Sequence, residues 1–395
     1  MLTPDPYLLD WLNLLFRWGH LMAGIAWIGT SFYFVALDFS LRSHAGLPAG
    51  VKGEAWEVHG GGFYQVQKYL SAPASLPDHL TWFKWEAYLT WVTGFLLLIV
   101  QYYVGAETYL IDPSVLLLTT WQAIAISVAT LLLGWLVYDV LCRSLAIKHP
   151  TLLMALVLLL IILAAYGLTH VFSGRGAFIH VGAFIGTLMA ANVFAVIIPN
   201  QRKITASLLR GQTPDPKYGA IGKQRSLHNT YLTLPVLLMM ISNHYAFLTS
   251  HPQSWILIGL IIVGGAALRH YLLRTEVGDD QAEIAWLLPI IGGALVLAMM
   301  LAAPREALIY DGPVSDQDVL AITQKHCVSC HAEKPTNATF KIPPKNVMLE
   351  TLDDLRLQKQ RILTQAVNGR AMPMGNKSGI TIEERAKLGA WLTKQ

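Results

Sequence analysis

A cysteine pair followed by a histidine stands in the last quarter of this 395-residue chain, in the segment CVSCH at residues 327–331. The spacing C-x-x-C-H is typical of covalent attachment of a c-type haem. A redox dithiol and half of a zinc site are the alternatives. Zinc would need a second Cys or His pair downstream, and a thioredoxin-like dithiol would need a βαβ context; the sequence has neither. The motif therefore predicts one haem c, joined to Cys327 and Cys330 by thioether bonds and bound at its iron by His331.

A methionine farther along the chain can complete the iron coordination. The segment GRAMPMGNKSG at residues 369–379 offers Met372 and Met374, and Met348 is a more remote candidate. A thioether is the usual second ligand in cytochromes c, and it raises the reduction potential. Met372 precedes Pro373, whose fixed φ can hold a ligand loop rigid, and this Met-Pro pattern is similar to class I cytochromes c. We predict Met372 as the second axial ligand.

The sequence around the motif predicts a small helical domain. Three pairs of a Ser or Thr with an acid three residues later form capping boxes, which start helices. The pairs are Ser315 with Asp318, Thr351 with Asp354, and Thr381 with Glu384, and they predict helices over about 316–327, 352–367 and 382–394. Such a small domain has a thin core, and a haem would fill much of it. We expect a class I cytochrome c domain over residues 306–395.

The residues before this domain have a composition that requires a membrane. The chain is 54% hydrophobic and only 14% charged, whereas an ordinary soluble domain carries about a quarter charged residues. A helix needs about 20 apolar residues to cross a bilayer. The expected fold is all-α, an eight-span transmembrane bundle over residues 1–305. Its spans lie at about 11–37, 84–104, 115–141, 150–170, 177–198, 228–249, 254–273 and 284–303.

Lysine and arginine are concentrated in alternate loops of this arrangement. They follow the first, third, fifth and seventh spans, most densely over residues 199–227, and Arg175 is the exception. Because basic loops stay on the cytoplasmic side, we expect a multi-pass protein of a bacterial inner membrane with both termini in the periplasm. The net charge of +4 is explained by these loops, and no basic cluster with interleaved aromatics indicates nucleic acid as a partner.

Histidines inside the predicted spans are candidates for a second redox centre, because ionisable residues in a membrane are expensive and usually functional. In the first span His20 lies on one helix face with Gly24 and other small residues, which would leave room for a flat macrocycle. The other candidates for ligands of a haem b are His180 and His244; His270 is more simply read as a hydrogen-bonded interior histidine. That simpler reading stays open for all four.

Several long segments resemble the urate oxidase N-terminal family. They are HLMAGIAWIGTSFYF (20–34), GEAWEVHGGGFYQVQKY (53–69), WFKWEAYLTWVTGF (82–95), NVFAVIIPNQRKI (192–204) and SLHNTYLTLPVLLMMISNHY (226–245). With a cytochrome c tail, this architecture is similar to the membrane-bound urate hydroxylases of bacteria. The resemblance implies oxidation of urate to 5-hydroxyisourate with water as the oxygen source. Electrons would pass to the chain's own haem c, and then to a soluble cytochrome c or a terminal oxidase.

For such a substrate, residues 38–83 and the start of the second span carry suitable side chains. A urate anion needs cationic or amide donors beside an aromatic face, and His59, Lys84 and Glu86 are the catalytic candidates, with Tyr64, Gln67 and Lys68 nearby. Glu86 or His59 would deprotonate the attacking water. Lys84 and Trp85 would otherwise only anchor the helix at the membrane surface. A cytoplasmic site would require electrons to cross about 30 Å of hydrocarbon, so we expect a haem b on the way.

Two other functions remain open at this point. The chain could be a membrane-anchored cytochrome c that transfers electrons without substrate chemistry of its own, or a transporter with an attached redox sensor. Transport is the least favoured, because only Pro235 and Pro289 interrupt the spans and no paired pattern of broken helices is present. The long aromatic loop favours an enzyme over a carrier.

Overall fold

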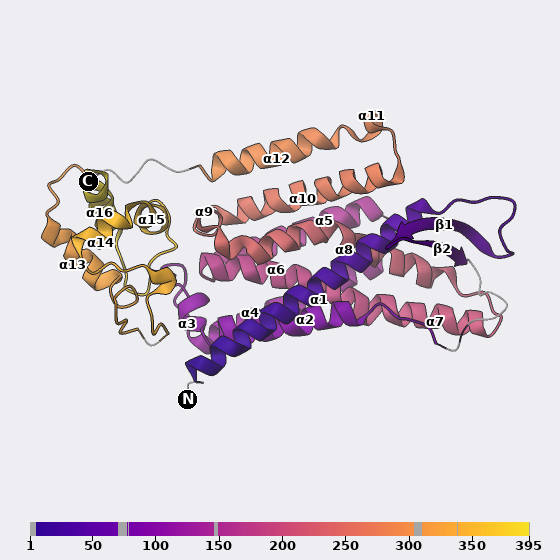
Figure 1. The fold of residues 1–395 in the computed structure, drawn as a ribbon, viewed down its shortest axis with the longest axis horizontal. Helices are drawn as coiled ribbons and strands as arrows, with labels where there is room; N and C mark the ends of the chain where they lie inside the picture. The colour runs from indigo at the N-terminus through magenta and orange to yellow at the C-terminus, as the bar shows by residue number, and fades with distance from the viewer. Residues whose placement is uncertain are drawn as a thin grey trace.

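Long helices running side by side make up most of the chain (Figure 1). The computed structural model describes residues 5–69, 77, 79–145, 149–303, 310–337 and 339–394. Six helices in these residues are long and apolar enough to cross a membrane: Tyr7–Ser40, Thr120–Leu145, Pro150–Thr169, Gly174–Leu209, Ser254–Glu276 and Gln281–Leu301. The chain is therefore consistent with a multi-pass membrane protein.

The other two predicted spans are also largely helical but are not among these six helices. The span predicted over 84–104 is α2 (Trp85–Leu97), continued by the π-helix η1 (Leu98–Tyr103). Of the span predicted over 228–249, residues 228–241 form the second part of α8 (Pro216–Ile241), whereas residues 242–249 leave this helix and form the short helices η3 (Ser242–His244) and α9 (Ala246–Thr249). Helix α2 packs against α1, and α8 packs against α6 and α10. Six helices thus meet the length and hydropathy requirement, and an eight-span bundle remains a proposal.

Helix α6 lies at the centre of the bundle, in contact with α2, α4, α5 and α8. A Cβ atom at Gly134 of α4 would lie 1.9 Å from the Phe184 ring of α6, so these two helices approach each other closely. Helix α1 instead leaves large apolar side chains such as Trp18 and Ile25 exposed, as a lipid-facing helix would.

The main bundle helices are α1 (Pro6–Ser40), α4 (Thr120–Leu145), α5 (Pro150–Thr169), α6 (Gly174–Ala191), η2 (Asn192–Ile197), α7 (Ile198–Leu209), α10 (Ser254–Val277) and α12 (Leu287–Leu301). Short helices α3 (Ala106–Tyr109), η3 (Ser242–His244), α9 (Ala246–Thr249) and α11 (Gln281–Ile284) join them.

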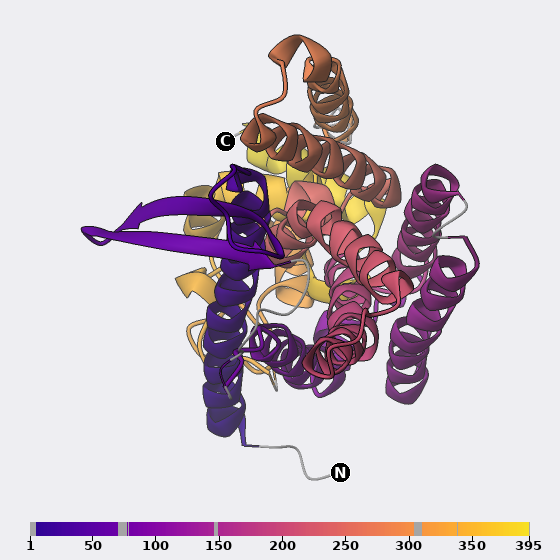
Figure 2. The same cartoon turned by 90° about the vertical axis from the view of Figure 1, so that its right-hand side faces the viewer.

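A β-hairpin between α1 and α2 departs from the all-α expectation. Strands β1 (Val51–His59) and β2 (Gly62–Tyr69) pair antiparallel, and Figure 2 shows them projecting sideways from the bundle. Gly60 and Gly61 both have positive φ, as a tight two-residue hairpin turn requires. Hydrogen bonds, led by the one from Gln67, hold the pKa of Glu54 at about 2. This segment of the loop 38–83 therefore folds as a sheet, and its aromatic and β-branched residues, such as Trp56, Val58 and Phe63, are types that favour strands.

The C-terminal tail folds as a small helical domain in which all three predicted capping boxes form. The predicted helix over 352–367 is divided at Gln358, where φ and ψ are −97° and 12°. Trp391 donates a hydrogen bond of 2.7 Å to Asp316, which joins the last helix of the domain to the first. The elements are α13 (Asp316–His326), η4 (Pro344–Asn346), α14 (Leu352–Leu357), α15 (Lys359–Ile362), η5 (Leu363–Val367), η6 (Met374–Asn376) and α16 (Ile382–Lys394).

Glu384 in the first turn of α16 should make the tail sensitive to acid. Burial would raise the pKa of its carboxyl, but hydrogen bonds from Thr381, Lys325 and His326 outweigh that effect and lower the pKa to about 2, against 4.5 for a free glutamate. A carboxyl with a lowered folded-state pKa stabilises the fold above its unfolded pKa, and the contribution is lost as the pH falls through the folded value. Wild type should therefore unfold at a higher temperature than Glu384→Gln at neutral pH, and the difference should shrink between about pH 4.5 and pH 2. Scanning calorimetry at a series of pH values measures this, and a pH-independent difference would contradict it.

Candidate functional site

The cysteine and histidine side chains of CVSCH project from one turn at the end of α13. Cys327 caps the helix, and its carbonyl oxygen accepts hydrogen bonds from the amides of Cys330 (3.1 Å) and His331 (2.9 Å). Both cysteines are free thiols. Burial raises the pKa of the Cys327 thiol to about 12, so this group stays protonated at neutral pH. The turn thus presents two thiols and an imidazole side by side.

His331 is held by a hydrogen bond that leaves its second ring nitrogen free to bind a metal. The Nδ1 atom lies 2.9 Å from the carbonyl oxygen of Val347. A carbonyl oxygen only accepts, so Nδ1 carries the proton and the neutral ring keeps its lone pair on Nε2. Metal-binding histidines are usually fixed in this way, with one nitrogen bonded to a carbonyl and the other to the metal. The orientation of His331 fits the role of an axial haem ligand.

Met372 lies in the loop between η5 and α16 and packs against the same apolar cluster as Cys327. Arg385 of α16, only 4% exposed, donates from Nη1 to the carbonyl oxygens of Met372, at 2.8 Å, and Ala366. The Met372 amide donates to the carbonyl of Gln365 at 2.9 Å, and the Met372–Pro373 peptide bond is cis. These contacts fix the loop. Two thiols, an imidazole with a free Nε2 and a thioether beside an apolar core are a donor set that suits haem c.

The histidines of the membrane helices have separate partners. His180 uses both ring nitrogens, Nδ1 at 2.7 Å from the Gly176 carbonyl and Nε2 at 2.8 Å from the Ser127 hydroxyl. His270 lies 2.7 Å from the Tyr231 hydroxyl. His244 is exposed in η3, beyond the end of α8.

His20, which lies in α1, makes its contacts with helix α2. Its Nδ1 lies 2.9 Å from the Thr90 carbonyl of α2, and a Cβ atom at Gly94 would come within 2.8 Å of the ring. Because a carbonyl only accepts, Nδ1 donates and Nε2 keeps its lone pair. Among the candidates for haem b ligands that lie within a long helix, His20 therefore keeps a ring nitrogen available, whereas both nitrogens of His180 have partners.

The residues predicted to act on the substrate are not brought together. His59 is exposed at the tip of the hairpin, Lys84 precedes α2, and Glu86 lies in the first turn of that helix. Within the described residues, no hydrogen bond or ion pair joins these three side chains. The Lys84 ammonium lies 5.5 Å from the centre of the Trp85 ring, which matches the membrane-surface anchor considered above. Two neighbours have structural partners, Gln67 with Glu54 and Lys68 with Asp38.

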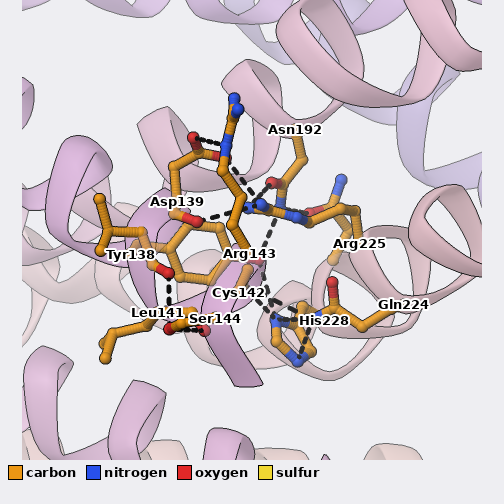
Figure 3. A network of polar contacts seen from close by, with 12 residues as sticks. Tyr138, Asp139, Leu141, Cys142, Arg143, Ser144, Asn192, Gln224, Arg225 and His228 are labelled. Atoms are coloured by element: carbon orange, nitrogen blue, oxygen red, sulfur yellow. Dashed lines mark hydrogen bonds and ion pairs between the residues drawn. The ribbon is translucent and has the colours of Figure 1, made fainter. Parts of the chain in front are cut away.

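A buried polar network links α4, η2 and α8 (Figure 3). The sequence alone did not predict it. The Asp139 carboxylate lies 2.6 Å from the Arg225 guanidinium, and the two residues are 7% and 2% exposed. The second oxygen of Asp139 pairs with Arg143 at 2.6 Å. Asn192 accepts from Arg225 at 3.1 Å and donates to the Tyr138 hydroxyl at 2.9 Å. A buried charge pair with this many partners is expensive to place in a membrane and marks a structural or functional centre.

The network continues through His228, which is 3% exposed. Its Nδ1 lies 2.8 Å from the Tyr138 hydroxyl, and its Nε2 lies 2.9 Å from the Gln224 amide nitrogen. Cys142 of α4 is 2% exposed, and its sulfur is 4.0 Å from Nδ1 of the same ring. Asn192 begins the π-helix η2, and π-helical turns are frequent at functional sites.

Two signals in the sequence could have revealed this network. Asp139 is the one acid in the predicted span 115–141, and an isolated acid in a span needs a partner. Arg225, His228 and Asn229 are spaced so that they share one face of a helix. By sequence alone Arg225 falls in the basic segment 199–227, because the polar start of α8 hides the fact that the helix begins at Pro216.

A cavity of about 410 Å³ lies between the bundle and the tail. Its bundle side is formed by the end of α3 and the residues after it, the start of α6 and the end of α9, and its tail side by residues from 370–376 and α16. Arg175, Arg370 and Arg385 line it with a single carboxylate, Asp112, so the lining is net positive. The tail approaches the bundle closely here, because a Cβ atom at Gly375 would lie 2.7 Å from the Ile111 carbonyl oxygen.

The apolar helices and the charges buried among them are those of a multi-pass membrane protein. Residues 6–302 match the family described as urate oxidase N-terminal, and the chain belongs to that family. The match indicates an enzyme that acts on urate as an oxidoreductase. No curated protein and no solved structure matches the chain. The match ends before the tail, so any role of the tail rests on the residues described above.

Proposed function

We propose that the chain is a membrane-bound urate hydroxylase linked to a haem c in its own tail. Urate and one water molecule give 5-hydroxyisourate, two protons and two electrons, so water supplies the added oxygen and the electrons leave through the tail. The proposal rests on two features that occur together in this chain. Residues 6–302 match the family, and the tail carries a C-x-x-C-H turn in which Nε2 of His331 is free to bind iron.

The residues of the tail have defined tasks in this proposal. Cys327 and Cys330 would attach the haem through thioether bonds, and His331, oriented by Val347, would hold one face of the iron. Met372 would hold the other face from a loop that Arg385 fixes. Haem c, when bound, accepts one electron at a time. A soluble cytochrome c or a terminal oxidase would then take the electrons from the tail.

The origin of the added oxygen tests this reaction class. Purified holoprotein is incubated anaerobically with urate, an artificial electron acceptor and isotopically labelled water, and the first product is analysed by mass spectrometry. We expect one labelled oxygen in 5-hydroxyisourate and no requirement for dioxygen. A product without label, formed only when dioxygen is present, would exclude the water-dependent reaction.

An electron-transfer subunit without substrate chemistry is the second candidate. The observation in its favour is that His59, Lys84 and Glu86 do not form a cluster. Such a subunit would be reduced by quinol and not by urate, so mixing the oxidised holoprotein with each reductant in turn distinguishes the two functions.

We further propose that both termini lie on the periplasmic side. This is supported by Figure 1, where the start of α1 and the tail lie at the same end of the bundle, as an even number of spans requires. The haem c would then sit on the side of the membrane where covalent attachment is expected.

A haem b in the bundle remains a separate proposal that rests on His20, whose Nε2 is free. In the pyridine haemochrome spectrum of the purified protein, His20→Ala should remove the haem b contribution and leave that of haem c. A wild-type spectrum that contains haem c alone would refute a haem b.

A further inference from the structure

We propose that the cavity between the bundle and the tail is the binding site of the urate anion, with Arg175 as its charged partner. The identity of the anion rests on the proposed function. The site itself is argued from the charge, the unsatisfied polar groups and the position of the cavity.

Arg175 stands in the first turn of α6, and among the residues that the structure describes its Nε atom has no partner. Its Nε atom is buried and makes no hydrogen bond, and its guanidinium forms no ion pair with the described residues. It is also the basic residue that the alternation of charged loops leaves unexplained. A buried donor without a partner costs stability, and a positive charge at a helix N-terminus favours an anion there. These facts point to an anionic ligand beside Arg175.

Neutral groups in the same cavity complement a flat molecule that carries both carbonyl and N–H groups. Thr249 is 2% exposed, and within the described part of the chain its hydroxyl has no hydrogen-bond partner. The buried side-chain oxygen of Asn376 likewise has no partner among the described residues. Thr249 can donate to a carbonyl oxygen and Asn376 can accept from an N–H. Tyr109 and Phe172 add aromatic surface to the lining, and small-molecule sites commonly combine a few polar groups with such walls.

The position of the cavity suits electron transfer to the tail. Arg370, Ala371 and Met374 line it, and these residues flank Met372 in the chain. A urate anion bound here would lie beside the loop that carries the proposed axial ligand. Its electrons would not have to cross the hydrocarbon core of about 30 Å, a crossing that a site at His59 and Lys84 would demand.

Binding of urate to the fully reduced holoprotein tests this site, because a reduced protein cannot oxidise the ligand during the measurement. Equilibrium dialysis with urate gives Kd for the wild type, Arg175→Gln and Thr249→Val. We expect Arg175→Gln to weaken binding about tenfold or more, as loss of a charge-assisted hydrogen bond does. Thr249→Val should weaken it about threefold while leaving the fold as stable or more stable, because it removes an unsatisfied buried hydroxyl. Arg210→Gln, an exposed residue at the end of α7, is the matched control and should bind like wild type.

The outcomes separate this inference from the proposed function. Wild-type affinity in both cavity variants, each with normal haem content, would overturn the site even if the protein oxidises urate. Unchanged affinity together with a shifted haem potential in Arg175→Gln would also overturn it, because the arginine would then serve the carboxylates of the haem. Weakened binding in both variants supports the site. This holds even if urate fails to reduce the haem of the protein. That failure would refute only the proposed function.

Discussion

Replacing Met372 with histidine should lower the reduction potential of the proposed tail haem by on the order of 0.2 V, within the range of about 0.8 V that axial ligands span. A methionine ligand raises the potential of a His-ligated haem, and an imidazole removes that effect. The haem of the variant should therefore be a poorer acceptor, and its reduction by urate should be slowed or abolished. Potentiometric titration followed by optical absorption measures the potential directly.

Met348→Leu is the matched control for this substitution. Met348 lies in the same domain, is 40% exposed, and was the remote alternative ligand. Its replacement should leave the potential unchanged. If the potential falls in Met348→Leu and stays unchanged in Met372→His, the axial ligand is Met348 and the assignment of Met372 is wrong.

Replacing Arg225 with methionine should destabilise the bundle by about 3–5 kcal/mol, the usual cost of leaving one member of a buried ion pair without its partner. The Asp139 carboxylate would remain buried, with only the largely exposed Arg143 beside it. That remaining pair should keep the loss toward the lower end of the range. Thermal unfolding of the protein in detergent, with the yield of folded protein as a second readout, measures the effect.

The double variant Asp139→Leu with Arg225→Met provides the control. Removing both charges leaves no unpaired ion, so the double variant should be more stable than Arg225→Met alone. The interaction energy from the full cycle isolates the coupling between the two side chains. If the two single losses simply add in the double variant, the side chains are not coupled and the network of Figure 3 does not act as a unit.

The tail could be predicted from the sequence because its determinants are local. The capping boxes join residues three positions apart, and all three form where expected. The turn at CVSCH follows α13 directly because the helix ends at His326. In such segments, the pattern of a few neighbouring residues decides the structure.

The bundle interior could be predicted only in outline because its contacts join distant residues. Asp139 and Arg225 are separated by 86 positions, and hydropathy, which located the helices, carries no information on which charges will pair. The candidates His59, Lys84 and Glu86 were chosen for their chemistry, but the hairpin turns its tip away from the bundle (Figure 2). The cavity at Arg175 forms from both the bundle and the tail, so no single segment reveals it.

The central claim is that urate delivers its electrons to the haem of the same chain. Oxidised, purified holoprotein is mixed with urate without oxygen while the haem c absorption is followed. We expect the haem to become reduced, with one urate consumed for every two haems, because each urate releases two electrons and each haem accepts one. A haem that stays oxidised in the presence of urate, in protein that dithionite reduces fully, would contradict the account.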